Sequence, residues 1–135
     1  MRILAIDFGD VRTGLAVSDL SGTLTGDAWV ITQKDMGKLA DEIVLEIQKR
    51  TVEEVVLGLP KNMDGSFGFR AEKTREFETI LAEKTNLPIV LWDERRTSFS
   101  ADQILIGVGK KGQKKKALQD AVAASLILEG YLARK

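Results

Sequence analysis

The sequence has no cysteine and no histidine among its 135 residues. Without cysteine there is no disulfide, no zinc-thiolate site and no cysteine nucleophile. Without histidine the chain lacks the commonest general base, the base of a serine triad and the imidazole ligands of metal sites. Chemistry at neutral pH must therefore rest on carboxylates, lysine, arginine, hydroxyl groups or a bound metal ion.

The sequence also lacks long apolar runs and an excess of charge of either sign. No apolar run approaches the roughly 20 residues of a membrane span, and 20 basic residues balance 20 acidic ones. The length predicts a single domain over residues 1–135. No leader pattern opens the sequence, so we expect a cytoplasmic protein without a membrane partner.

The charge is nevertheless segregated along the chain. Between residues 95 and 116, seven basic residues accompany one acidic residue, Asp102. A lysine-rich stretch such as "KKGQKKK" is often only a solvated loop, but a flexible one can neutralise backbone phosphates without reading bases. Phe67 and Phe69 could stack on unpaired bases, although anchoring of their loop in the core is the favoured interpretation.

Apolar patterning predicts an α/β fold. Short strands are expected at residues 2–7, 15–19 and 28–32, which suggests an antiparallel meander, and buried strands at 54–60 and 87–92. Helical periodicity predicts helices at residues 35–50, 70–84, 98–106 and 117–133, the last two separated by the flexible lysine-rich stretch. This order predicts a mixed sheet with helices, in which a meander precedes right-handed crossovers.

Acidic residues stand where these elements would bring them together. Asp7 ends the first strand, and Asp93 and Glu94 end the last. Because ligands collect at the carboxyl ends of strands in open α/β sheets, these acids could lie side by side. Asp120 shares its helix face with Ala117, Ala124, Ile127 and Tyr131, so its carboxylate should point toward the protein body, where a charge needs a partner or a metal.

Each acid also has a purely structural interpretation. Asp7 could begin a turn, Asp120 could favour the positive end of its helix dipole, and Asp93 with Glu94 could be a solvated strand end. Coincidence of all three is the less favoured explanation. Carboxylates without histidine, near a basic segment, fit Mg²⁺ or Mn²⁺ holding a substrate phosphate, which predicts phosphodiester hydrolysis.

Four motifs, in this order and length, resemble the YqgF (RuvX) family, relatives of the RuvC-type Holliday junction resolvases in the RNase H-like superfamily. They are "AIDFGDVRTGLAVSD" at 5–19, "GLPKNMDGSFG" at 58–68, "DERRTS" at 93–98 and "DAVAASLILEGYL" at 120–132. The resemblance implies an RNase H-like sheet of five strands, the first three antiparallel, and a metal-dependent nuclease. Family members are described as nucleases that trim the 5′ end of pre-16S rRNA, with Holliday junction resolution as an older assignment.

The resemblance also assigns roles to residues. It implies Asp7, Glu94 and Asp120 as catalytic acids and metal ligands, with Asp93 as a less certain ligand. Arg12, Arg95 and Thr97 match motif positions and would bind substrate; the lysine-rich stretch adds Lys114, Lys115 and Lys116 as expected phosphate contacts. One departure is that the strand "VVLGLP" ends without a carboxylate, so Glu94 would have to supply a ligand from the neighbouring strand.

Other classes of protein compete with the nuclease. "DFGDVRTG" resembles the phosphate-binding turn of the actin, Hsp70 and sugar-kinase superfamily, but those ATPases close two lobes over the nucleotide and this chain offers one. A non-catalytic nucleic-acid-binding module is a further alternative. The sequence leaves open RNA against DNA, cleavage within a strand against cleavage from its end, and monomer against homodimer. Strand alternation allows only one of Asp93 and Glu94 to face the site, without saying which.

Overall fold

The computed structural model describes residues 1–59, 68–93 and 112–134, and the architecture below is that of these residues. The elements, in chain order, are β1 (Ile3–Asp7), β2 (Arg12–Ser18), β3 (Thr25–Thr32), α1 (Met36–Arg50), β4 (Glu54–Leu59), α2 (Phe69–Lys84), β5 (Ile89–Asp93) and α4 (Gly112–Ala133). The helix expected at residues 98–106 lies outside the described residues. No helix within the described ranges is long and apolar enough to cross a membrane.

The five strands form one mixed sheet in the order β3-β2-β1-β4-β5. β1, β2 and β3 are antiparallel neighbours, whereas β4 pairs parallel to β1 and β5 parallel to β4. The predicted meander followed by parallel crossovers is therefore confirmed. The register places Asp7 opposite Gly14 and Leu59 opposite Asp93, so the carboxyl ends of three parallel strands meet the start of β2 at one edge.

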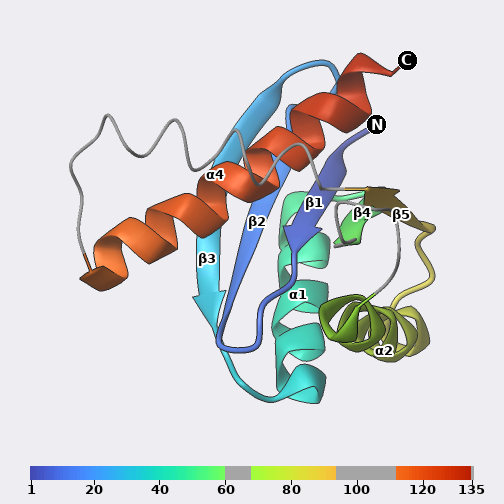
Figure 1. The fold of residues 1–135 in the computed structure, drawn as a ribbon. Coiled ribbons are helices and arrows are strands. Elements are labelled where there is room, and N and C mark those ends of the chain that lie inside the picture. Colours follow the sequence, from blue (N-terminus) through green and yellow to red (C-terminus); the bar gives the residue numbers. More distant parts are fainter. Residues whose placement is uncertain (60–67, 94–111, 135) are drawn as a thin grey trace.

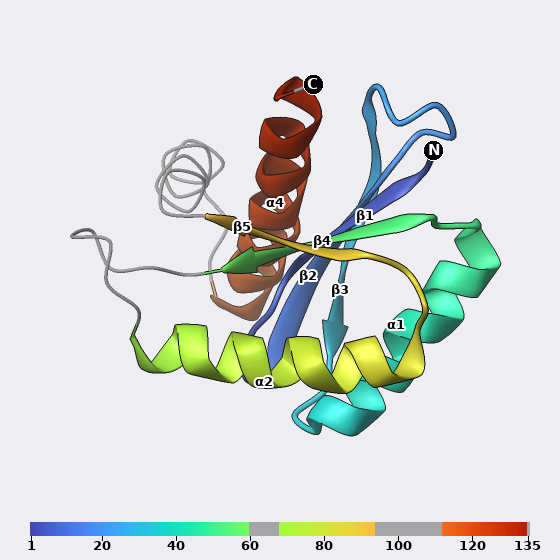
Figure 2. The ribbon, with the colours of Figure 1, turned by 90° about the vertical axis from the view of Figure 1, so that its right-hand side faces the viewer.

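Helices cover both faces of this sheet (Figures 1 and 2). α4 crosses one face, while α1 and α2 pack on the other. β1 shows why both faces need cover: Ile3 and Ala5 are buried in the cluster beneath α4, and Leu4 and Ile6 are buried in the cluster on the opposite face. A continuous apolar run suits a strand buried on both sides.

α1 illustrates how local sequence sets an element's limits. Asp35 caps the helix, because its Oδ1 accepts a hydrogen bond of 2.9 Å from the backbone N–H of Lys38. Leu39, Ile43 and Ile47 recur at helical spacing and are buried against the sheet. The helix ends at Arg50, followed by Thr51 in the left-handed conformation. Its predicted limits were accurate to one residue.

Three predicted starts were wrong by three or more residues, one of them that of β3, which begins at Thr25 rather than at residue 28. β2 begins at Arg12 rather than at residue 15, because the polar Arg12 and Thr13 pair with Thr32 and Ile31 in the antiparallel ladder with β3. α4 begins at Gly112 rather than at residue 117, so the lysines at 114–116 are helical and not a flexible loop. Glutamine and lysine are good helix formers. The helix was predicted from the spacing of its apolar residues, and these polar residues do not contribute to that pattern.

Candidate active site

Asp7 ends β1 at the carboxyl edge of the parallel strands and is partly buried. Side chains alternate across a strand, and Ile3 and Ala5 both pack in the cluster beneath α4. Asp7 therefore belongs to the face of the sheet that α4 covers. On the neighbouring strand β4, Val56 is buried on the same face, so alternation assigns Gly58 to that face as well, beside Asp7. Gly58 has no side chain to offer there.

Gly14 brings α4 close to the sheet at this point. It is the register partner of Asp7, and a Cβ atom built on Gly14 would lie 2.6 Å from the carbonyl carbon of Asp120 and closer still to its oxygen. Only glycine allows the backbones of β2 and α4 to approach so closely. Asp7 is therefore next to Gly14 in the sheet, and Asp120 packs on the same glycine from α4. The close packing at Gly14 brings the two acids near each other.

Asp120 faces the sheet as its helix periodicity predicted. Ala124, Ile127 and Tyr131, on the same side of α4, are buried. The described side chains also reveal a partner that sequence reasoning missed: Arg12 Nε donates a hydrogen bond of 3.1 Å to Asp120 Oδ2. Arg12 had been assigned to substrate alone, and no pattern in the sequence links residues 108 positions apart.

Burial raises the pKa of the Asp120 carboxyl above its ordinary value, because desolvation disfavours the charged form. The hydrogen bond and the charge of Arg12, with a smaller effect from the charge of Arg70, act in the opposite direction but do not cancel it. The ionised carboxylate is therefore held at a cost, and it gains from any cation that approaches.

The first turn of α2 lies beside the β1–β2 turn. Lys73 Nζ is 3.5 Å from Asp10 Oδ1 and lies 5.0 Å from the ring centroid of Phe69. The Phe69 residue is 69% exposed, so the expectation that it anchors a loop in the core was wrong. Its position at the start of a helix directs the ring outward, while Phe77 on the same helix fills the core. Phe67 lies outside the described residues.

Asp93 lies on the other face of the sheet. In β5, Val90 and Trp92 pack against the cluster beneath α4, whereas Ile89 and Leu91 pack against the cluster beneath α1 and α2. Alternation places Asp93 with Ile89 and Leu91. Among the described residues, moreover, no three acidic side chains are grouped closely enough to hold a metal ion.

Six further site residues were predicted from the sequence. Glu94, Arg95 and Thr97 lie outside the described residues. Lys114, Lys115 and Lys116 belong to the amino-terminal part of α4, ahead of Asp120, but only their backbone is described. Of the predicted site residues, the structure therefore brings Asp7, Arg12 and Asp120 together.

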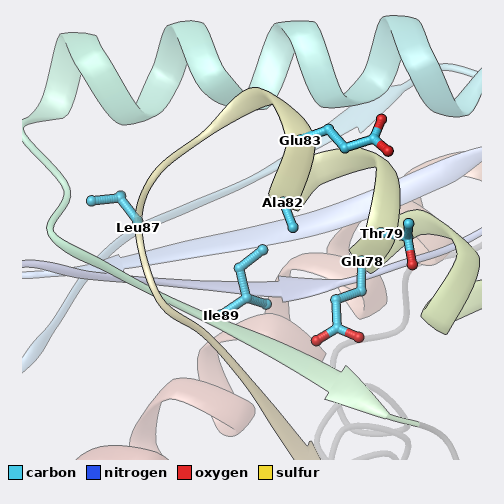
Figure 3. A pocket seen from close by; sticks show the side chains of 6 residues that line it. All are labelled: Glu78, Thr79, Ala82, Glu83, Leu87 and Ile89. Atoms are coloured by element: carbon cyan, nitrogen blue, oxygen red, sulfur yellow. The ribbon is translucent and has the colours of Figure 1, made fainter.

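A hollow of about 470 Å³ lies elsewhere, between α2 and the edge strand β5 (Figure 3). Its lining residues are Glu78, Thr79, Ala82, Glu83, Leu87 and Ile89. Leu87 and Ile89 pack with the cluster beneath α1 and α2, which is the face opposite Asp120. Of the predicted site residues that the structure describes, none lines this hollow, so it is separate from the place where Asp7, Arg12 and Asp120 meet.

The five-stranded sheet, with its antiparallel β1, β2 and β3, its parallel β4 and β5 and its covering helices, is an RNase H-like fold. Asp7 and Asp120 lie where β1, β2 and α4 meet. The structure of Thermus thermophilus RuvC in complex with a Holliday junction substrate has the same fold, with a TM-score of 0.64 and 15% sequence identity. The match covers 99% of this chain and 95% of RuvC. At this identity the likeness shows the fold alone.

The chain belongs to the RuvX family, described as "Holliday junction resolvase", which matches residues 1–134. A relative from Halothermothrix orenii is 44% identical over 132 residues, covering 98% of this chain and 94% of the relative. A relative from Caldanaerobacter subterraneus is 41% identical over 133 residues, covering 98% and 96%. Both are named "Putative pre-16S rRNA nuclease". The resemblance read from the motifs is confirmed, and the chain is a hydrolase of the nuclease class.

Proposed function

We propose that this chain is a divalent-metal-dependent nuclease that processes the 5′ end of pre-16S rRNA during ribosome biogenesis in the cytoplasm. The observation that carries the proposal is the meeting of Asp7 and Asp120 beside Gly14, in a chain of the RuvX family. The names of its relatives support the RNA substrate.

The donor atoms of the site fit a hard cation. Asp7 and Asp120 offer carboxylate oxygens, the ligands that Mg²⁺ and Mn²⁺ prefer. Two carboxylates are few for such a site, and we propose Glu94 as the third ligand. The placement of Asp93 on the opposite face supports that choice, since alternation directs consecutive side chains to opposite faces. A divalent cation held there supplies Lewis-acid catalysis of phosphodiester hydrolysis.

The basic residues around the acids suit a polyanionic substrate. Arg12 borders Asp120 on the sheet side, and Lys114, Lys115 and Lys116 lie in the amino-terminal part of α4, where the helix dipole adds positive potential. We propose that these residues, with Arg95 and Thr97, bind backbone phosphates. We also propose that Phe69, which is exposed and lies beside Lys73, stacks on an unpaired base.

A second candidate is Holliday junction resolution, which is supported by the description of the family and by the fold shared with RuvC. The two substrates can be compared directly. Purified protein is incubated with a pre-16S rRNA fragment and with a four-way DNA junction, each with Mn²⁺, with Mg²⁺ and with EDTA. We expect metal-dependent cleavage of the RNA, and preferential cleavage of the junction would favour the second candidate.

Variants test whether the proposed residues perform the reaction. Asp7→Asn and Asp120→Asn should remove most of the cleavage activity, because each replaces a charged oxygen ligand by a neutral amide. Asp41→Asn is the matched control, since Asp41 lies on α1 and pairs with Lys84 at 2.9 Å on the far side of the sheet. Unchanged cleavage by both site variants would contradict the proposed site. Binding without cleavage by the wild type would indicate the non-catalytic module, and binding of a nucleotide alone would indicate the actin-like alternative.

A further inference from the structure

The carboxylate of Asp120 has two candidate cationic partners, Arg12 and the proposed metal. Arg12 Nε holds Oδ2 at 3.1 Å, and the proposed metal needs the same carboxylate. Both side chains are partly buried, at 29% exposure for Arg12 and 28% for Asp120, so their charges are screened less than surface charges. A guanidinium and a divalent cation on one carboxylate repel each other. Arg12 and the metal therefore compete for Asp120.

The Arg12 guanidinium also has a second potential partner, a phosphate group of the substrate. It is the first residue of β2, at the edge of the sheet where β1 ends, and its partial exposure leaves the guanidinium access to solvent. A guanidinium binds phosphate through paired hydrogen bonds and keeps its charge at any physiological pH. A nucleic-acid phosphate close to a metal on Asp7 and Asp120 would lie within the reach of this side chain.

We propose that Arg12 takes the place of the metal on Asp120 in the free protein and exchanges Asp120 for a substrate phosphate when the metal binds. Arg12 is then a positioning residue with two alternative partners. The exchange makes metal and nucleic acid bind cooperatively, because the metal releases the phosphate-binding group and the phosphate removes the metal's competitor. The inference rests on the proposed function, since it requires a metal at Asp120 and a phosphate substrate.

The discriminating measurement is metal affinity without substrate. Mn²⁺ is titrated by calorimetry into the wild type and into Arg12→Gln. We expect Arg12→Gln to bind Mn²⁺ about tenfold more tightly, the change that corresponds to losing one competing charge-assisted hydrogen bond. A merely structural role predicts the opposite, because a loosened site binds metal less well. Equal or weaker Mn²⁺ binding by Arg12→Gln overturns the proposal.

Two further variants separate the hydrogen bond from the charge. Arg12→Lys keeps the charge but loses the Nε donor, so its Mn²⁺ affinity should fall between those of the wild type and Arg12→Gln; it also serves if Arg12→Gln does not fold. Arg70→Gln removes a charge that acts on Asp120 without a hydrogen bond between them in the described contacts. It should change Mn²⁺ affinity less than Arg12→Gln, and an equal change would overturn the exchange in favour of a general charge effect.

The cooperative step is measured with a pre-16S rRNA fragment. Its binding is followed by fluorescence anisotropy with and without Ca²⁺, which replaces Mn²⁺ to slow cleavage. Ca²⁺ should tighten RNA binding several-fold more in the wild type than in Arg12→Gln, and equal gains would overturn the proposal. If the wild type cleaves RNA but these comparisons fail, only the exchange is wrong. If the wild type neither binds metal nor cleaves, the proposed function itself is wrong.

Discussion

The close approach of β2 and α4 at Gly14 can be tested by adding a single methyl group. In Gly14→Ala the new Cβ would lie 2.6 Å from the carbonyl carbon of Asp120, whereas carbon atoms in contact prefer about 3.5–4.0 Å. The helix or the strand must therefore move by roughly 1 Å. Overpacking of this kind costs about 1–3 kcal/mol of unfolding free energy, and a shift of about 1 Å at reacting groups can lower a rate about 100-fold.

Whether Gly14→Ala loses or gains unfolding free energy distinguishes steric overpacking from the backbone preference of glycine. Replacing glycine within a strand would otherwise stabilise the protein by about 0.5–1 kcal/mol. Gly130→Ala is the matched control: it lies on α4, and its Cβ would meet Trp92 Nε1 at 3.4 Å, an ordinary contact. That variant should gain up to about 1 kcal/mol from helix propensity.

Urea unfolding measures the stability of both glycine variants, and cleavage of the rRNA fragment measures their activity. We expect Gly14→Ala to unfold at a lower urea concentration than the wild type and to cleave more slowly, while Gly130→Ala is unchanged or more stable and fully active. A Gly14→Ala protein as stable and as active as the wild type would refute the argument that this glycine sets the position of Asp120.

Three further predictions concern individual side chains. Asp93→Asn should cleave like the wild type and Glu94→Gln should lose most activity, measured on the same RNA; the reverse result would move the third ligand to Asp93. Burial raises the pKa of Asp120, so the folded state binds the carboxyl proton more tightly than the unfolded state does. The bound proton therefore stabilises the folded state below about pH 4, and this stabilisation is lost as pH rises through the pKa of the folded state. Asp120→Asn should therefore be more stable than the wild type at pH 7 in EDTA, and urea unfolding near pH 3 should show no difference; equal stability at both pH values would contradict the burial argument. Arg50 bonds to Glu46 at 2.8 Å and stacks on Trp29 at 3.9 Å, joining α1 to β3, so Arg50→Ala should cost about 1 kcal/mol in thermal or urea unfolding without changing cleavage.

Much of the fold was predictable because the signals were local. The apolar run of β1 and the capped, periodic α1 identify their elements from a few neighbouring residues. Boundaries failed where polar residues adopt regular structure through pairing or propensity, as at Arg12 in β2 and at the lysines in α4. The prediction for Phe69 was wrong for a related reason, since the sequence around an aromatic residue in a glycine-flanked loop does not show whether its ring faces the core or the solvent.

The sequence alone determined the kind of chemistry open to this protein and the candidates for it. The lack of histidine and cysteine restricts a metal site to oxygen ligands, and Asp7 and Asp120 were identifiable from strand ends and helix periodicity. Only the tertiary structure decided that both acids flank Gly14, that alternation along β5 assigns Asp93 to the face opposite α4, and that Arg12 holds Asp120. Local patterns cannot specify these relations, because contacts between residues more than 100 positions apart are set by sheet register and by how closely two backbones can pack.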